Sequence, residues 1–200
     1  MRIALLGGSG DIGEGLALRF GRDTNHDIVI GSREPEKARE AAESYEGADV
    51  VVLAVPPYHV ADTVDSVADS LGEDDIIVSP ATGMQRDEEG FHYHRPEAGS
   101  VTALAAGAAP DSVPVVGAFH NLAAGRLADL DAELGIDTLV IGEDEAAKAT
   151  VSSLAEDIEG LRALDAGGIA NAPEIESVTP LLINVGMHND GLDDLGVRFE

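Results

Sequence analysis

The stretch Met1–Phe20, MRIALLGGSGDIGEGLALRF, decides how this sequence is interpreted. Its apolar start, RIALL, runs directly into glycines, which is typical of a buried strand that ends in a tight turn. Gly8, Gly10 and Gly13 stand in the spacing G-x-G-x-x-G, and a helical pattern follows them. In a strand-turn-helix unit these three glycines serve a tight turn, close approach of a pyrophosphate, and close packing of helix on strand. A glycine turn with a purely structural role is the alternative.

The start of a helix directly after such a turn favours a phosphate ligand, because its first N–H groups lack partners and its dipole is positive there. We therefore predict a dinucleotide site. Its expected contacts in this stretch are Gly8, Ser9, Gly10, Asp11, Ile12 and Gly13.

The residues after the second expected strand favour NADP over NAD. An NAD site usually has an acidic residue at the end of this strand, whereas here DIVI is followed by GSREPEKAR. Ser32 offers a hydroxyl, and Arg33 and Lys37 offer positive charge, all suited to a 2′-phosphate. The alternative assigns Lys37 and Arg39 to ion pairs on a helix surface.

Short apolar runs alternate with helical patterns along most of the chain, which indicates an α/β fold with a parallel sheet. We expect strands at Arg2–Leu6, Asp27–Ile30, Asp49–Val55, Asp75–Val78, Val113–Ala118 and Asp137–Ile141, and helices at Asp11–Arg22, Pro35–Glu46 and Val60–Leu71. After Gly142 two helical patterns flank the short stretch LRALDAG. The prediction is a Rossmann-like doubly wound parallel sheet over residues 1–142 and a small C-terminal helical unit over residues 143–200.

Composition narrows the class of protein further. The 200 residues include 38 acidic and 12 basic side chains, a net charge of −26, and no cysteine. The absence of cysteine excludes disulfides, thiolate metal sites and cysteine nucleophiles, and the charge argues against nucleic acid as a partner. No apolar run reaches the roughly 20 residues that cross a bilayer. We expect a cytoplasmic protein from a halophilic archaeon, because concentrated salt screens such charge; an unusually acidic protein from an ordinary environment is the alternative.

Two further loops follow expected strands at the same end of the sheet. Val55, Pro56 and Pro57 form a rigid wall after the third strand, and SPATGM, which contains Gly83, follows the fourth. His120 directly follows the fifth strand, where open α/β sheets keep their sites; a helix start without a ligand is the alternative for it. His92 and His94 lack a matching carboxylate, so we predict no metal site.

Several stretches resemble the NADPH-dependent reductases of coenzyme F420, an 8-hydroxy-5-deazaflavin. They include IVIGSREPEKA, IIVSPATG, GAFHNLAAGRLADL, IEGLRALDAGGIANA, ESVTPLLINV and DLGVRF, in the same order along the whole chain. The resemblance implies an oxidoreductase that transfers a hydride reversibly between NADP(H) and F420, generally as a homo-oligomer.

The resemblance also implies roles for single residues. It places Ser9, Ser32, Arg33 and Lys37 at the NADP phosphates, Val55, Pro56, Pro57 and Tyr58 along the cofactor, and His120, Leu122, Ser177, Thr179, Leu195 and Gly196 in the deazaflavin pocket. Two features depart from the family. Pro173 stands where members often carry an arginine, and the junction between Glu46 and Asp49 lacks a segment of about twenty residues.

Hydride transfer between two rings depends on positioning, so we expect no catalytic nucleophile. A backbone N–H near Leu195 or the Thr179 hydroxyl is the expected donor to the ring anion. Hydroxyls in an apolar helix, such as those of Ser177 and Thr179, also often bond to the helix's own carbonyls. Two other functions stay open: an imine reductase of the pyrroline-5-carboxylate type, and a non-catalytic NADP-binding module.

Overall fold

The computed structural model of the chain describes residues 1–31 and 47–200. Ser32, Arg33, Lys37 and the helix expected over Pro35–Glu46 lie outside the described residues. The strands are β1 Arg2–Leu6, β2 Asp27–Gly31, β3 Val50–Leu53, β4 Ile76–Ser79, β5 Met84–Asp87, β6 Gly90–Tyr93, β7 Val115–Gly117, β8 Ile136–Gly142 and β9 Leu161–Asp165. The α-helices are α1 Asp11–Asp23, α3 Val60–Val67, α4 Val101–Ala108, α5 Ala124–Ala128, α6 Glu145–Glu156, α7 Ala172–Glu176 and α8 Val178–Met187.

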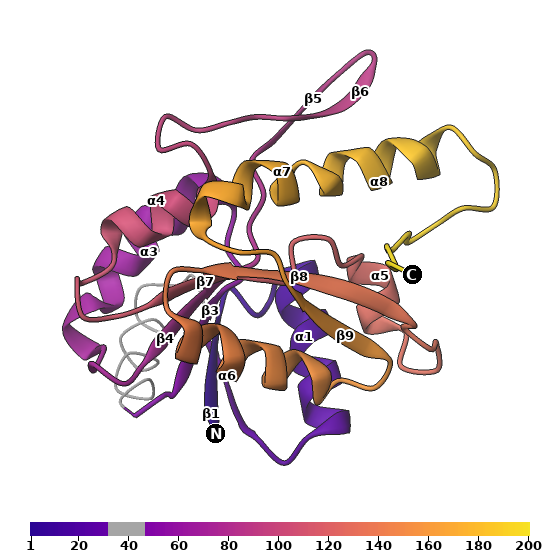
Figure 1. Cartoon of the computed structure of the whole chain (residues 1–200). Helices are drawn as coiled ribbons and strands as arrows, with labels where there is room; N and C mark the ends of the chain where they lie inside the picture. The colour runs from indigo at the N-terminus through magenta and orange to yellow at the C-terminus, as the bar shows by residue number, and fades with distance from the viewer. Residues whose placement is uncertain (32–46) are drawn as a thin grey trace.

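Seven of the described strands form one twisted sheet in the order β2-β1-β3-β4-β7-β8-β9 (Figure 1). Neighbours run parallel except β7 and β8, which pair antiparallel through Val116 and Gly117. The Rossmann-like doubly wound sheet predicted from the sequence is confirmed. Each of the six expected strands is present, with ends that differ by at most two residues.

The sheet separates two apolar layers, because residues that alternate along its parallel strands face opposite sides. Ile3 and Leu5 of β1 join the core that contains Leu16 and Phe20 of α1. Ala4 and Leu6 instead join the core that contains Val60 and Val64 of α3 and Val101 of α4. Helices α1, α5 and α6 therefore cover one face, and α3 and α4 cover the other.

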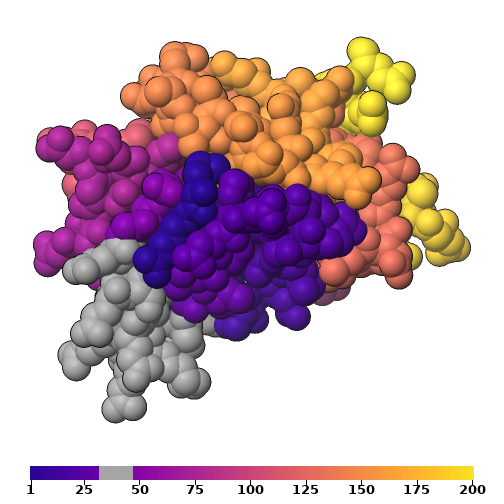
Figure 2. Space-filling view, turned by 90° about the horizontal axis from the view of Figure 1, so that it is seen from below, coloured from indigo at the N-terminus to yellow at the C-terminus, as the bar shows by residue number. Residues whose placement is uncertain are grey.

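The stretch LRALDAG, expected as a short break between helices, forms β9 at one end of the sheet. It packs with α6 beside the N-terminal part of the chain, as Figure 2 shows from below. The turn between α6 and β9 makes the contact with the N-terminal part. Asp23 Oδ2 accepts the Glu159 N–H at 3.1 Å, and His26 Nε2 lies 3.0 Å from Asp157 Oδ2. The sheet thus continues beyond residue 142, and a division into two domains there stays a prediction.

A hairpin of β5 and β6 projects from the sheet and was not expected from the sequence. Helix α8 lies along it, and the Asn184 amide contacts the Phe91 backbone on both sides: Oδ1 accepts the N–H at 2.8 Å, and Nδ2 donates to the carbonyl at 2.7 Å. After α8 the chain returns to β8, where the Asp137 N–H donates to the Val197 carbonyl at 2.8 Å. None of the described helices is long and apolar enough to cross a bilayer.

Candidate active site

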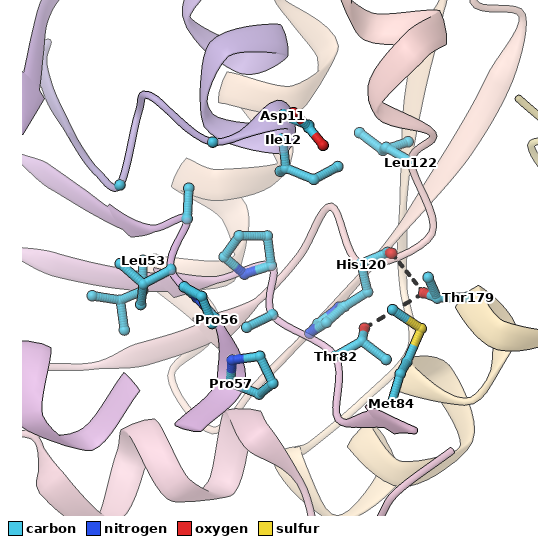
Figure 3. A pocket seen from close by; sticks show the side chains of 16 residues that line it. Asp11, Ile12, Leu53, Pro56, Pro57, Thr82, Met84, His120, Leu122 and Thr179 are labelled. Carbon is cyan, nitrogen blue, oxygen red and sulfur yellow. Dashed lines mark hydrogen bonds between the residues drawn. The ribbon is translucent and has the colours of Figure 1, made fainter. Parts of the chain in front are cut away.

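A cavity of about 300 Å³ opens where the carboxyl ends of four strands meet. Figure 3 shows its walls, which come from the loops after β1, β3, β4 and β7 and from α8. Open α/β sheets keep their ligand sites at this edge, next to the point where the strand order reverses. The lining residues are Gly7, Gly10, Asp11, Ile12, Leu53, Ala54, Val55, Pro56, Pro57, Pro80, Ala81, Thr82, Met84, His120, Leu122 and Thr179.

The glycine turn after β1 owes its shape to Gly7, not to Gly8 as the spacing led us to expect. Gly7 has φ of +83°, and a Cβ there would lie 2.4 Å from the Ala54 carbonyl oxygen. At Gly13 a Cβ would lie 2.6 Å from the Gly8 Cα, so α1 packs directly on the turn. Neither position has room for a side chain. The absence of a side chain at Gly7 lets the loops after β1 and β3 come into contact.

The first turn of α1 fits a phosphate. Its N-cap residue, Gly10, has no side chain to accept from the first-turn N–H groups, so those donors remain for a ligand. Asp11 and Ile12 line the cavity beside them, while Gly8, Ser9 and Gly13 do not. The backbone of this chain therefore fits the dinucleotide that its sequence predicts.

The proline loop after β3 supplies one wall through Val55, Pro56 and Pro57. Tyr58 lies outside this wall: the residue is 75% exposed, and the centroid of its ring lies 4.4 Å from that of the His59 ring. Gly83 is also outside the lining. A Cβ there would lie 2.3 Å from the His94 carbonyl oxygen, so Gly83 permits the two ends of the hairpin to approach closely, where the His94 N–H donates to the Gly83 carbonyl at 2.9 Å.

His120 follows β7 through an unusual backbone bend. Phe119 has φ of +67°, which a bulky residue rarely adopts, and its N–H donates to Thr138 Oγ1 at 2.9 Å. The His120 side chain is buried, and burial lowers its pKa to about 4. Its ring is therefore neutral at neutral pH, and its Nε2 lies 3.2 Å from Thr102 Oγ1.

A second cavity of about 550 Å³ adjoins the first. Both are lined by Asp11, Ile12, Met84, Leu122 and Thr179. The other residues that line the second cavity are Asn121, Ala123, Ala124, Gly125, Leu182, Ile183, Gly186, Met187, Leu192, Asp193, Asp194 and Leu195. The molecule thus offers two neighbouring compartments with a common wall, one beside the glycine turn and one beneath α8.

Thr179 occupies this common wall, and its hydroxyl is engaged. It donates to the His120 carbonyl at 2.6 Å. The Thr82 hydroxyl lies 3.4 Å away, and because the Thr179 proton is already used, Thr82 is the donor in that pair (Figure 3). The single Thr179 proton is therefore not directed at either cavity, contrary to the role of donor to a ring anion that we expected of it. For Ser177 the alternative of a bond to the helix's own carbonyl is confirmed, because its hydroxyl donates to the Glu174 carbonyl one turn back.

Ser177 and Gly196, both expected in the second compartment, line neither cavity. A Cβ at Gly196 would lie 2.5 Å from Ile136 Cγ2, so Gly196 lets the C-terminal segment pack on β8. Pro173 stands in the first turn of α7, where it offers no charge to an acidic ligand.

Sequence reasoning missed several lining residues that had a signal. Thr82 and Met84 flank Gly83 in the same loop. In α8, Thr179, Leu182, Ile183 and Gly186 recur at the spacing of one helix face, so a periodicity analysis could have found them. Among the described residues no group of three or more histidine or acidic side chains could hold a metal ion.

The comparisons with known proteins agree with this geometry. The family model described as "NADP oxidoreductase coenzyme F420-dependent" matches residues 2–83. The F420-dependent NADP reductase of Methanocaldococcus jannaschii is 35% identical over 211 residues, covering 94% of this chain and 93% of that protein. The one from Methanothermobacter marburgensis is 34% identical over 221 residues, covering 99% and 97%.

A crystal structure described as a candidate F420-dependent NADP reductase from Arthrobacter sp. FB24 has the same fold. Its TM-score is 0.82 at 22% identity, and the match covers 100% of this chain and 99% of that one. On the identity and coverage of the archaeal relatives, this chain belongs to the family of F420-dependent NADP reductases.

Proposed function

We propose that the protein transfers a hydride reversibly between NADP(H) and coenzyme F420. The observation that carries this proposal is the pair of adjoining cavities at the carboxyl edge of the sheet, with Ile12, Leu122 and Thr179 in the wall of both. One compartment begins at the glycine turn and suits the nicotinamide end of a dinucleotide. The other suits a second flat ring held against it.

For NADP we propose the backbone of the glycine turn, with Gly8, Ser9, Gly10, Asp11, Ile12 and Gly13, and the wall of Val55, Pro56 and Pro57. Tyr58 and Gly83 stay candidates at its edge. Ser32, Arg33 and Lys37 are proposed for the 2′-phosphate on the basis of the sequence. For the deazaflavin we propose His120, Leu122, Thr179 and Leu195 as direct contacts, with Ser177 and Gly196 acting on the shape of the pocket.

The residues of the site act by positioning. NADPH carries a hydride, and a deazaflavin accepts it on a ring carbon while a proton from solution completes the reduced form. Pro56 and Pro57 hold one wall rigid, and Leu122 with Ile12 excludes water between the compartments. Neutral His120 adds a polar group without adding a charge.

The second cavity argues against a non-catalytic NADP-binding module, because such a module needs no acceptor compartment. Thr179 and Leu195 both line that cavity. Helix α8 contributes the apolar side chains of Leu182, Ile183 and Met187 to one wall, and this surface suits a broad aromatic ring better than a small charged imine such as pyrroline-5-carboxylate.

The test is a spectroscopic assay in molar potassium chloride. Loss of the visible absorbance of oxidised F420 on adding NADPH and enzyme is expected, with NADH much slower. The Arg33→Ser variant should lose the preference for NADPH, whereas the matched variant Arg39→Ser should keep it. Tight NADPH binding without bleaching, or turnover of pyrroline-5-carboxylate instead, would overturn the proposal.

The wider setting is also a proposal. The charge of −26 supports a halophilic archaeal protein of the cytoplasm. Leu181, Val185 and Met187 of α8 are exposed apolar side chains, which supports a homo-oligomer that covers them. Light scattering after gel filtration in molar potassium chloride tests this, and a monomer would exclude it.

A further inference from the structure

Glu176 is a buried acidic residue outside both cavities. Its side chain is fully buried at the end of α7, yet four donors surround it. Thr102 donates to Oε1 through its N–H at 2.9 Å and its hydroxyl at 3.1 Å. The Val101 N–H at 3.1 Å and the Tyr93 hydroxyl at 3.0 Å donate to Oε2.

These bonds define how the Thr102 hydroxyl is oriented. Backbone N–H groups can only donate, and a carboxylate with four donors around it can only accept. Burial raises the pKa of Glu176, but the four bonds favour its ionised form. The single Thr102 proton therefore points to Glu176, and the oxygen offers only lone pairs to its other neighbour, His120.

The tautomer of His120 follows from this orientation. Its Nε2 lies 3.2 Å from Thr102 Oγ1, and a contact with a lone pair requires a proton on Nε2. The neutral ring then carries a bare acceptor at Nδ1. That atom is buried and has no hydrogen-bond partner among the described residues. The ring itself lies in the cavity wall next to Thr82 (Figure 3).

The same short segment of chain also holds the His120 backbone. Thr179, three residues after Glu176, donates to the His120 carbonyl at 2.6 Å. The junction of α7 and α8 thus holds one pocket residue in two ways: through Thr102 at the ring and directly at the main chain.

We propose that Glu176 and Thr102 are positioning residues that hold His120 protonated on Nε2, so that Nδ1 accepts a hydrogen bond from an amide-type N–H of a bound ring. Two ligands carry that chemistry in this site, the nicotinamide carboxamide and the pyrimidine part of the deazaflavin. The proposal rests on the proposed function for the identity of the ligand, but not for the tautomer.

The first test is nitrogen NMR of the imidazole rings in the ligand-free protein, with His120→Asn to assign the signal. Wild type and Thr102→Ser should show a proton on Nε2 of His120. Thr102→Val, which has the same shape but no hydroxyl, should show a mixture of tautomers. A proton on Nδ1 in wild type, or a Thr102→Val spectrum identical to wild type, would overturn the proposal whatever the enzyme's activity.

The second test is kinetic and compares NADPH with its 3-acetylpyridine analogue, which lacks the carboxamide N–H. One hydrogen bond corresponds to a loss of about five- to tenfold in kcat/KM. If Nδ1 contacts the carboxamide, Thr102→Val should lose this factor with NADPH and not with the analogue. If it contacts the deazaflavin, the loss should appear with both.

Controls separate positioning from stability and from the proposed function. Thr102→Ser should restore activity, and Thr150→Val on the distant helix α6 should match wild type. Equal kcat/KM for Thr102→Val and wild type with both nucleotides would overturn the proposal. A wild type that binds NADPH but does not reduce F420 would instead refute the proposed function, and the NMR result would still decide the tautomer.

Discussion

At Gly7 both the backbone conformation and the packing exclude a side chain. Its φ of +83° is unfavourable for any side chain, at about 1–2 kcal/mol, and a Cβ would also overlap the Ala54 carbonyl. Overlap in a packed site adds about 1–3 kcal/mol. Gly7→Ala should therefore lower the free energy of unfolding by several kcal/mol and weaken NADPH binding, as urea melts and fluorescence titration would measure.

Gly21 provides the matched control. It lies in α1, and among the described residues no atom outside the backbone of that helix and the adjacent residues comes within 4 Å of where a Cβ would stand. Gly21→Ala should therefore raise stability by about 1 kcal/mol through helix propensity. Equal effects of the two substitutions would contradict the role assigned to the turn.

His120 should titrate far from the ordinary histidine range. Burial lowers its pKa from 6.5 to about 4, so the folded protein binds this proton less readily than the unfolded chain does. The stability that the neutral ring contributes is present above pH 6.5 and is lost as the pH falls through about 4. Proton NMR titration should show one imidazole, assigned by His120→Asn, that stays neutral at pH 5; a midpoint near 6.5 would contradict the burial.

At the residue scale the sequence predicted which residues lie at the cavity better than it predicted the hydrogen bonds that they make. Gly10, His120 and Leu122 do lie around one cavity, since strand ends bring them there, and helix α8 adds Thr179. The direction of the Thr179 hydroxyl could not be predicted, because it depends on a carbonyl 59 positions away in the chain. Glu176 gave no signal at all, since one glutamate just before an apolar helix resembles a surface residue.

Among the elements, α1 holds the loop around α5 through the side chains of Arg19 and Arg22, and Arg22 donates to the Leu130 carbonyl. Arg19 is fully buried, and its guanidinium donates to the carbonyls of Arg126, Leu127, Asp129 and Ala132. Replacement by methionine would leave these buried acceptors without donors. We expect Arg19→Met to lower the free energy of unfolding by about 2–4 kcal/mol in urea melts.

Arg126 is the control for this substitution, because its side chain is in the same loop and makes one exposed bond to the Glu133 carbonyl. Arg126→Met should change stability by less than about 0.5 kcal/mol. A similar loss in both variants would mean that the loop does not depend on Arg19.

Five of the six strands that the sequence predicted are largely buried apolar runs, and β2 is the exception. Strands such as Val50–Leu53 are buried on every residue, and such runs have few other interpretations. The hairpin escaped prediction because β5, MQRD, is exposed throughout and has no apolar alternation. Helix α4, VTALAAGA, is apolar on all sides and so has no helical period to detect.

At the scale of the whole molecule, the main feature is the repulsion that arises from a net charge of −26 on 200 residues. Screening shortens the range of repulsion from about 10 Å in 0.1 M salt to about 3 Å in 1 M salt. The melting temperature should therefore rise steadily as potassium chloride is increased over this range. Calorimetry measures it, and a melting temperature independent of salt would argue against adaptation to brine.

The overall architecture was predictable because the glycine turn is one strong local signal, which identifies the strand before it and the helix after it. The second cavity was not, since its walls come from Ile12, Leu122, α8 and Leu195. Only the family resemblance joined such distant positions before the structure did. Local patterns therefore predicted the compartment beside the glycine turn, and long-range packing built the compartment beneath α8.

The contact between Asn184 and Phe91 has a consequence for association with other chains. A two-stranded ribbon exposes backbone donors and acceptors along its outer edge, where another strand can add and begin aggregation. The Asn184 amide imitates a peptide group and occupies one donor and one acceptor at that edge. Asp87, Glu88 and Glu89 at the tip of the ribbon add repulsion between molecules. Helix α8, which lines the second cavity, thus also shields the β6 edge of the ribbon from unwanted strand addition.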